Sequence, residues 1–275
     1  VIPCGSKISH ANFNDSITLE NACDKVSFVI HLAGLNAKES KEDAKAALFV
    51  NGLGTLKLLE AAEKKGVSRF LFFSTIHVYG FPLVDQIEES LLPLPIDQYS
   101  ITNRLAEDYV LSANRNKKLK GAVIRLSNAV GKPVIYRSNC WSLVVNDLCH
   151  QAIKLKSLKI NSDGRQSRDF IAIKDICNAM EFIMTLPNKK FRGEIFNLGG
   201  TAHTIYEIAL LIAERYYILF GFKLKIETQV QVKSKELSDK FVFSTRKLDK
   251  LGLVSKNHLI FEIDQLLKYC DKNSK

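Results

Sequence analysis

Short patterns typical of buried strands alternate with longer helical patterns along the first half of this chain. Apolar runs rich in β-branched or aromatic residues occur at Val26–Leu32, Val67–Ser74 and Ala122–Leu126. Between them, residues 53–65 and 103–113 repeat apolar side chains at the spacing of an amphipathic helix. Parallel strands that are buried on both faces and joined by helices produce this alternation. The sequence therefore predicts an α/β fold built on a doubly wound parallel sheet.

The pattern changes after Gly131, where a polar connection begins. The segments that follow are a helix (Trp141–Leu155), a short strand (Leu158–Asn161), the segment 164–175 and a helix after it, a strand (Glu194–Leu198), a strongly apolar helix (Thr204–Phe220) and a basic, mixed tail. We interpret them as a smaller C-terminal α/β domain. The predicted boundaries are 1–131 for the first domain and 132–275 for the second, with residues 164–188 packing back on the first.

Charge and cysteine content exclude several classes of protein. The net charge is +10, but the lysines are scattered and no recognition-helix or aromatic-interleaved motif accompanies them, so we expect no nucleic-acid partner. No apolar run approaches the roughly 20 residues of a membrane span, so we expect no membrane association. The six cysteines are far apart and form no C-x-x-C pair, which predicts no metal site and a cytoplasmic location.

Small and hydroxyl-bearing residues lie where the predicted strands end. Leu32, Ala33 and Gly34 follow the first strand, and Ser74 and Thr75 end the second. Tyr99 is predicted in a loop that enters the next helix. Ligands of doubly wound sheets bind beyond the carboxyl ends of the strands. A phenol beside a hydroxyl at such a place can move a proton while a cofactor moves a hydride.

Six motifs occur in order along the chain. They are His31-Leu32-Ala33-Gly34, Asn51-Gly52-Leu53-Gly54-Thr55, Ser74-Thr75-Ile76-His77-Val78-Tyr79-Gly80, Arg125-Leu126-Ser127-Asn128-Ala129-Val130-Gly131, the segment 164–175 with Arg168 and Asp169, and Phe196-Asn197-Leu198-Gly199-Gly200. Together they resemble the extended short-chain dehydrogenase/reductase family, in particular its NAD-dependent nucleotide-sugar epimerases and dehydratases. The resemblance runs over almost the whole chain.

The resemblance implies a Rossmann-like sheet with a smaller substrate domain, and a reaction that moves a hydride and a proton on a sugar-nucleotide hydroxyl, in the synthesis of surface-polysaccharide precursors. It implies NAD, in preference to NADP, as cofactor, a nucleotide-sugar as substrate, and a possible homodimer formed through the helices that follow Asn36 and Tyr99. It also implies residue roles. The catalytic positions are Thr75, Tyr99 and Asn103; the cofactor-binding positions are Leu32, Ala33, Gly34, Asn51, Ser74 and Tyr99; the substrate-binding positions are Thr75, Asn128 and Arg168; Glu107 matches the acidic residue of the Tyr99 helix.

Two departures from the family pattern bear on activity. The glycine-rich G-x-x-G-x-x-G turn, which holds the cofactor pyrophosphate at a helix N-terminus, does not occur in this sequence. Val1 to Cys4 resembles the family's second strand, so we expect the first strand and helix to lie outside the sequence, and Gly5-Ser6-Lys7 stands where the ribose-binding acid is expected. The second departure is Asn103, which replaces the lysine of Y-x-x-x-K and carries no charge to lower the pKa of Tyr99.

Three functions are compatible with these residues. The first is an NAD-dependent epimerase/dehydratase-like enzyme acting through Thr75 and Tyr99. The second is a catalytically silent relative that keeps the sugar-nucleotide pocket around Asn128 and Arg168 and serves as a binding or scaffold protein. The third, to which we give little weight, is an RNA-binding relative whose RNA retention depends on salt.

Overall fold

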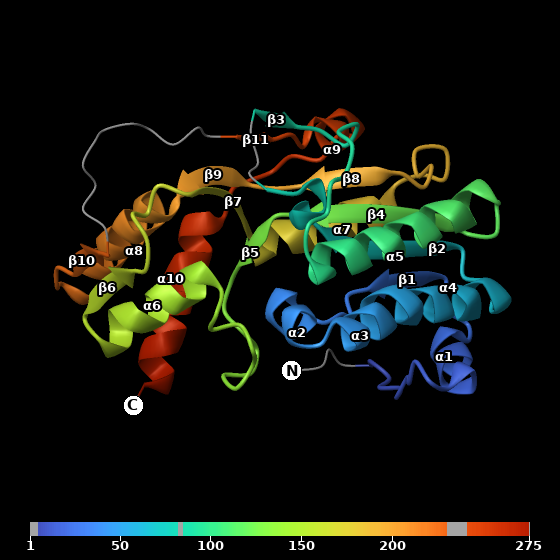
Figure 1. Ribbon diagram of the computed structural model, residues 1–275, viewed down its shortest axis with the longest axis horizontal. Coiled ribbons are helices and arrows are strands. Elements are labelled where there is room, and N and C mark those ends of the chain that lie inside the picture. The colour runs from blue at the N-terminus through green and yellow to red at the C-terminus, as the bar shows by residue number, and fades with distance from the viewer. Residues whose placement is uncertain (1–4, 82–84, 230–240, 275) are drawn as a thin grey trace.

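The structure is a computed structural model that describes residues 5–81, 85–229 and 241–274. Val1–Cys4, predicted as a strand, lies outside the described residues. The main sheet has four parallel strands in the order β1-β2-β4-β8 (Figure 1). Its strands are β1 (Phe28–His31), β2 (Arg69–Thr75), β4 (Lys120–Leu126) and β8 (Ile195–Leu198). Non-consecutive neighbours in a parallel sheet require crossover connections, and the predicted doubly wound architecture is confirmed.

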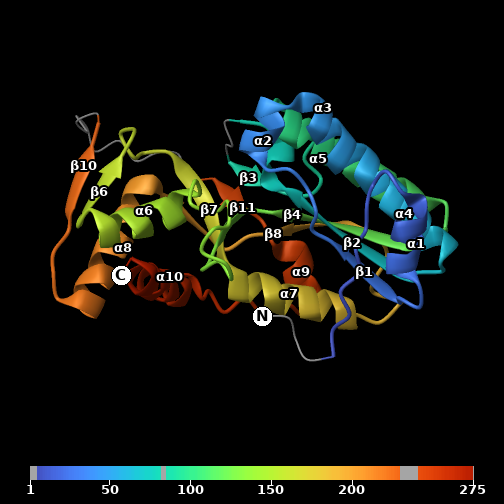
Figure 2. The ribbon, with the colours of Figure 1, turned by 90° about the horizontal axis from the view of Figure 1, so that it is seen from below.

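Helices cover both faces of this sheet (Figure 2). On one face α4 (Gly54–Lys64) and α5 (Gln98–Arg115), with α1 (Ser16–Cys23) beside α4, share a core with Phe70, Phe72 and Val123. On the other face α7 (Ile173–Thr185) and α9 (Arg246–Leu251) cover Leu71, Ala122 and Ile124. Alternate residues of β2 and β4 thus point to opposite faces of the sheet, and both faces are buried. This is why the sequences of these strands are continuously apolar.

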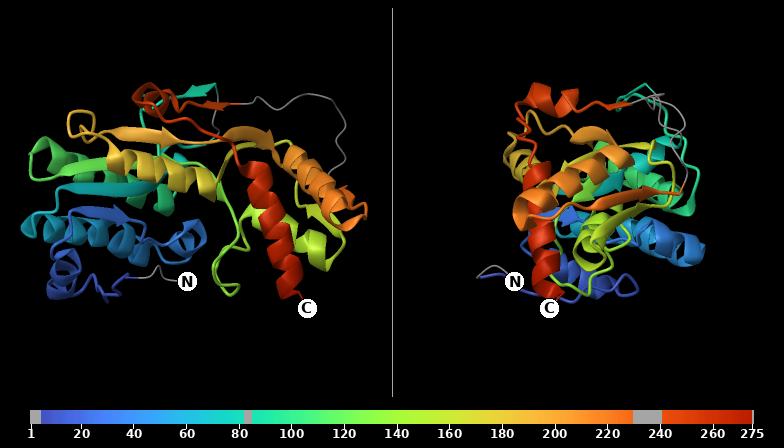
Figure 3. Two further views of the ribbon diagram at one scale, coloured as in Figure 1. Left: turned by 180° about the vertical axis from the view of Figure 1, so that it is seen from behind. Right: turned by 90° about the vertical axis from the view of Figure 1, so that its left-hand side faces the viewer.

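A second group of elements follows β4 in the chain. The helices α6 (Val144–Lys154), α8 (Ile205–Phe220) and α10 (Leu259–Asn273) pack against one another around Leu148, Ile212 and Leu266 (Figure 3). The strands β6 (Ser157–Ile160) and β10 (Lys225–Thr228) form a parallel pair beside them. This group has its own apolar core, and the division at residue 131 stays a prediction.

Two small sheets connect the main sheet to this group. One contains β5 (Asn128–Val130), β7 (Ser167–Ala172) and β9 (Thr201–Thr204), with β7 between the others. Because β5 follows β4 and β9 follows β8 after one or two residues, this sheet continues from the carboxyl ends of the main strands. The other pairs β3 (Gln86–Ile87) with β11 (Val242–Phe243). Residues from both small sheets or their flanks therefore lie beside the edge where ligands are expected.

Helix starts differ from the prediction at two places. Tyr99 was expected in a loop, but it lies in the first turn of α5, because Asp97 Oδ1 accepts a hydrogen bond from Ser100 N at 2.8 Å and caps the helix. The next helix was predicted over residues 53–65, but helical structure begins earlier, and Asn51 lies within the π-helical segment η1 (Leu48–Leu53). That segment continues from α2 (Ala37–Glu42) and α3 (Ala44–Ala47) and leads into α4.

The basic C-terminal tail is more ordered than its composition indicates. Its charged residues alternate with apolar ones at helical spacing, and α10 buries Leu259, Ile263, Leu267 and Cys270. The many charged residues between the apolar ones made the helical spacing hard to recognise from composition alone.

His31, which belongs to the predicted strand Val26–Leu32, is the last residue of β1 and is buried. Its ring is 2% exposed and lies against the rings of Phe13, Phe70 and Phe72. Thr55 Oγ1 donates to the backbone carbonyl of Asn51 at 2.6 Å, so it accepts from His31 Nε2, 2.9 Å away. Burial without an acidic partner lowers the pKa of His31 to about 4.

This depressed pKa predicts that the fold loses stability in mild acid. Below about pH 6.5 the unfolded chain binds a proton at this histidine and the folded chain does not, so the free energy of unfolding should fall by about 3 kcal/mol between pH 6.5 and pH 4 from this group. Urea unfolding at a series of pH values measures the effect. His31→Gln, which can still donate to Thr55, should flatten this part of the profile, whereas the exposed-residue control His10→Gln should not. If the free energy of unfolding changes equally with pH in the wild-type protein, His31→Gln and His10→Gln, the effect does not come from His31.

Candidate functional site

Tyr99 and Thr75 meet at the carboxyl end of β2. Thr75 is the last residue of β2, and its Oγ1 accepts from His77 N at 3.2 Å, capping the short helix η2 (Ile76–Tyr79). Burial raises the pKa of Tyr99, the nearby charge of Asp97 raises it further, and a side-chain hydrogen bond with Thr75 acts in the opposite direction. The two hydroxyl groups, which come from segments 24 residues apart, therefore share one place, and the phenol is protonated at neutral pH.

Asn103 lies one helical turn after Tyr99 but does not point toward its hydroxyl. Its Nδ2 donates to the Tyr99 backbone carbonyl at 2.8 Å. The neighbouring Arg104 is directed elsewhere, since its guanidinium pairs with Glu107 at 3.1 Å and with Asp108 at 2.7 Å. Neither residue supplies a positive charge that would favour the tyrosinate, in agreement with the raised pKa of Tyr99.

A cavity of about 160 Å³ opens on one side of Tyr99. It brings together most of the residues predicted to bind the cofactor, and its walls are formed by Leu32, Ala33, Gly34, Leu35, Asn36, Asn51, Phe72, Phe73, Tyr99 and Asn103. Asn51 shapes the wall: its Oδ1 accepts from Leu35 N at 2.7 Å and its Nδ2 donates to Thr102 Oγ1 at 3.1 Å. A Cβ at Gly34 would come within 3.1 Å of Asn51 Oδ1, so the loop needs a small residue there.

The residues of this cavity fit the nicotinamide and ribose end of a dinucleotide. Small loop residues leave room for a flat ring, and Tyr99 and Asn103 stand on the opposite wall. The other end of the dinucleotide is held in this fold by a glycine-rich turn at a helix N-terminus, and the 275 residues contain no such turn. The structure thus offers half of a dinucleotide site.

Ser74, predicted at the cofactor site, belongs to a buried polar network instead. Its Oγ donates to Glu107 Oε1 at 2.6 Å. Arg125 donates to the same carboxylate from Nε at 3.0 Å and from Nη2 at 2.7 Å, and its guanidinium lies over the Tyr79 ring. Arg125 and Glu107 are both fully buried. The network joins β2, β4 and α5 directly beneath Thr75 and Tyr99, so it fixes their separation.

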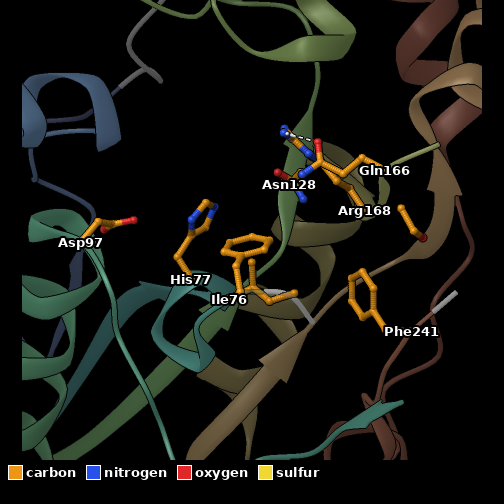
Figure 4. A pocket seen from close by; sticks show the side chains of 9 residues that line it. Ile76, His77, Asp97, Asn128, Gln166, Arg168 and Phe241 are labelled. Carbon is orange, nitrogen blue, oxygen red and sulfur yellow. Dashed lines mark hydrogen bonds between the residues drawn. The ribbon is translucent and has the colours of Figure 1, made fainter. Parts of the chain in front are cut away.

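A second cavity, of about 230 Å³, is lined by His77, whose ring packs against the Tyr99 ring, and Figure 4 shows the side chains that line it. It contains Asn128 and Arg168, two of the three residues predicted to bind substrate, but Thr75 does not line it; its lining consists of Ile76, His77, Phe81, Asp97, Asn128, Gln166, Ser167, Arg168 and Phe241. Asn128 Nδ2 donates to the Asp169 carbonyl at 2.8 Å, and Arg168 Nη2 donates to Gln166 Oε1 at 2.9 Å. Burial lowers the pKa of Arg168, which still carries its charge at neutral pH.

Asn128 and Arg168 also border a third cavity of about 250 Å³. Ser142, Val144 and Val145 form its far wall at the start of α6. No side chain caps this helix, so its first backbone N–H groups are free to bind an acceptor. The Arg168 guanidinium and the N-terminus of α6 both border this cavity, so the cavity suits a phosphate or diphosphate group.

Sequence reasoning assigned no role to several residues of the second cavity. His77 and Asp97 each lie two residues from a predicted catalytic position, and that proximity was the available signal. Gln166 likewise lies two residues from a predicted substrate residue, Arg168, whereas Phe241 comes from a distant segment that nothing local marks.

Residues 5–81, 85–229 and 241–274 contain neither a membrane-spanning helix nor a metal cluster. There, no helix has the length and apolar character that a membrane crossing requires. In the same ranges, no three His, Cys, Asp or Glu side chains are grouped so that they could hold a metal ion.

Comparison with known proteins identifies relatives over most of the chain. Residues 4–199 match the NAD dependent epimerase/dehydratase family. The UDP-glucose 4-epimerase of Rhizobium leguminosarum bv. trifolii is 28% identical over 203 residues, which cover 69% of this chain and 62% of that protein. The dTDP-D-glucose 4,6-dehydratase of Mus musculus is 30% identical over 177 residues, 64% of this chain and 48% of that protein. The chain thus spans about half to three-fifths of these curated relatives.

Solved structures show the same fold. The UDP-glucose 4-epimerase of Thermus thermophilus in complex with NAD superposes with a TM-score of 0.79 at 23% sequence identity, covering 96% of this chain and 86% of that one. Because the sequence identity is only 23%, this similarity shows that the two proteins share a fold and nothing more specific.

Proposed function

The chain belongs to the NAD dependent epimerase/dehydratase family, and from that premise we propose that it binds a nucleotide-sugar and transfers a hydride and a proton at one sugar hydroxyl. The observation that carries the proposal is that Tyr99 lines the cavity that fits a nicotinamide and packs against His77, which lines the cavity of Asn128 and Arg168. The relatives named above are a UDP-glucose 4-epimerase and a dTDP-D-glucose 4,6-dehydratase, which favours a hexose nucleotide as substrate.

The substrate's charged part belongs at Arg168. A diphosphate bridging the second and third cavities would meet the Arg168 guanidinium and the first N–H groups of α6. The sugar would then occupy the second cavity, with Asn128 as a hydrogen-bonding partner and His77 and Asp97 on the wall nearest Tyr99. In this arrangement residues 1–131 hold the cofactor side of the site and residues 132–275 most of the substrate side. The homodimer stays a prediction.

Thr75 and Tyr99 act on the reacting hydroxyl. Thr75 Oγ1 orients the sugar oxygen, and the Tyr99 phenol exchanges a proton with it. A bound nicotinamide supplies the hydride acceptor and donor. Leu32, Ala33, Gly34, Tyr99 and Asn103 would hold that ring and its ribose.

The proposal is tested by mixing the protein with NAD and a panel of UDP-, GDP- and dTDP-sugars and following products by NMR. We expect a new sugar nucleotide from at least one member of the panel, and its formation should require Arg168. Product formation that is unchanged in Arg168→Ala would contradict the proposed binding mode.

Introducing a cation at position 103 should increase activity. Asn103→Lys places an ammonium group near the phenol, so the pKa of Tyr99 should fall, its proton should transfer more easily, and kcat should rise across the pH profile. Asn103→Gln, which is longer than asparagine but neutral, is the control and should leave the profile in place. An unchanged profile in Asn103→Lys would show that the missing charge does not limit the reaction.

A catalytically silent binding protein is the second candidate. The observations that favour it are the neutral Asn103, turned back on its own helix, and the raised pKa of Tyr99. This candidate predicts UDP-sugar binding by calorimetry that depends on Arg168, with no product at any pH and no effect of Tyr99→Phe on affinity. Turnover that disappears in Tyr99→Phe excludes it.

A further inference from the structure

His77 is a titratable group in the second cavity that the proposed chemistry leaves unused. It belongs to η2, two residues after Thr75, and its ring lines the cavity with Asp97 and Arg168 (Figure 4). Its ring meets the Tyr99 ring edge to face, with centroids 5.9 Å apart and planes at 79°. The Phe81 ring packs on it in the same manner, with centroids 5.2 Å apart. The imidazole is thus held beside the phenol rather than free in solvent.

The charges around His77 come from three elements. Burial, the largest effect, lowers its pKa; Asp97, before α5, raises it; and Arg168, on β7, lowers it. Tyr99, on α5, faces it as an uncharged phenol. The net result is a neutral imidazole at neutral pH, with a ring nitrogen able to accept a proton.

His77 differs from the other titratable groups around this cavity in its capacity to accept a proton at neutral pH. Tyr99 is protonated because its pKa is raised, so it can donate a proton but cannot hold a second one until it loses its own. Asp97 Oδ1 already accepts from Ser100 N at 2.8 Å and from Ser100 Oγ at 2.9 Å. Arg168 is a permanent cation. Among the described residues of this cavity, the imidazole is the group best suited to accept a proton at neutral pH.

We propose that His77 is a second acid–base residue of this site, which accepts the proton released when the sugar hydroxyl is oxidised. The inference rests on the proposed function. The sugar O–H bond breaks and its proton passes to the Tyr99 oxygen, while the proton of the phenol passes to a ring nitrogen of His77. The electron pair left on the sugar oxygen forms the carbonyl as the carbon loses its hydride to the oxidised nicotinamide. Tyr99 remains a phenol throughout, and the imidazolium returns the proton when the carbonyl is reduced again.

This role explains how the site can work with Asn103 in place of a lysine. A tyrosinate never has to persist, because the imidazole takes the charge next to Asp97, which stabilises it. The pH dependence follows with a definite sign: activity is present while His77 is neutral and is lost as the pH falls through its pKa.

The test is the pH profile of kcat/KM for the sugar nucleotide that the panel identifies. In the wild-type protein we expect activity to fall toward acid with a slope of one, with a midpoint below the usual histidine range because burial lowers the pKa of His77. His77→Gln should lack this acidic limb and should be slower at pH 7 by on the order of 100-fold, with KM changed less than about threefold. His10→Gln, which removes an exposed histidine, is the matched control. An acidic limb that persists in His77→Gln, or a change in KM alone, would overturn the proposal.

A second measurement does not depend on turnover. Ring nitrogen NMR of the labelled protein follows the His77 titration without ligand, with UDP and with UDP-glucose. We expect UDP-glucose to shift the His77 pKa and UDP alone to leave it unchanged, since only the sugar reaches this wall. UDP-glucose that binds without moving the titration overturns the role of His77 and leaves the proposed function standing, whereas failure of every nucleotide-sugar of the panel to bind overturns the proposed function itself.

Discussion

Replacing Tyr99 with phenylalanine is expected to lower kcat for the sugar-nucleotide reaction by about 100- to 10,000-fold. The variant keeps the ring that packs against His77 and removes only the hydroxyl that shares a hydrogen bond with Thr75. The proton of the sugar hydroxyl then has no first acceptor. Binding should change little, because Arg168 and Asn128 are untouched, so the loss should be found in kcat rather than in KM.

The control for this variant lies on the same helix. Tyr109→Phe removes a phenol hydroxyl from α5 at a residue that packs against the apolar core between the helices and the sheet, away from both cavities. It should keep wild-type kcat. A Tyr99→Phe protein that retains more than about a tenth of the wild-type rate would show that the phenol is not in the proton path.

Replacing Glu107 with glutamine is expected to destabilise the fold by about 3–5 kcal/mol. The carboxylate accepts from Ser74, from Arg104 and twice from Arg125, and no part of its side chain reaches solvent. Its loss leaves the buried Arg125 guanidinium without a counter-charge. Because natural domains are stable by only about 5–15 kcal/mol, this is a large fraction of the total, and equilibrium unfolding in urea should measure it directly.

Two further variants identify the cause of that loss. Asp108→Asn, one residue away and half exposed, removes a surface partner of Arg104 and should cost less than about 1 kcal/mol. The double variant Glu107→Leu with Arg125→Met replaces the buried pair by apolar side chains and should be more stable than Glu107→Gln. If Glu107→Gln costs as little as Asp108→Asn, the buried pair is not what holds β4 and α5 together.

The main sheet could be predicted because its strands are buried on both faces. Residues such as Leu71 and Phe72 point to opposite cores, so the run stays apolar throughout and its type is clear without a structure. The α10 helix was missed for the opposite reason: its apolar residues are interleaved with charged ones, and the excess of lysine in that region was given more weight than the helical period.

The candidate site could be predicted only where its residues are close together in the chain. Thr75 was identified from its place at a strand end, and Tyr99 from the family motif. Ser74 was placed at the cofactor because sequence does not indicate which face of a strand end meets the ligand, and the structure turns its hydroxyl to Glu107. Phe241 reaches the second cavity only through the flank of the β3–β11 pair, a contact between distant segments that local patterns do not contain.

The central claim is that a sugar nucleotide binds with its reacting hydroxyl at Tyr99 and Thr75. The most direct measurement is a crystal structure of the protein soaked with UDP-glucose. The account predicts one sugar hydroxyl within about 3.2 Å of both Tyr99 Oη and Thr75 Oγ1, with the diphosphate at Arg168. A sugar ring that lies away from both oxygens while the diphosphate occupies Arg168, or a diphosphate bound elsewhere, would contradict it.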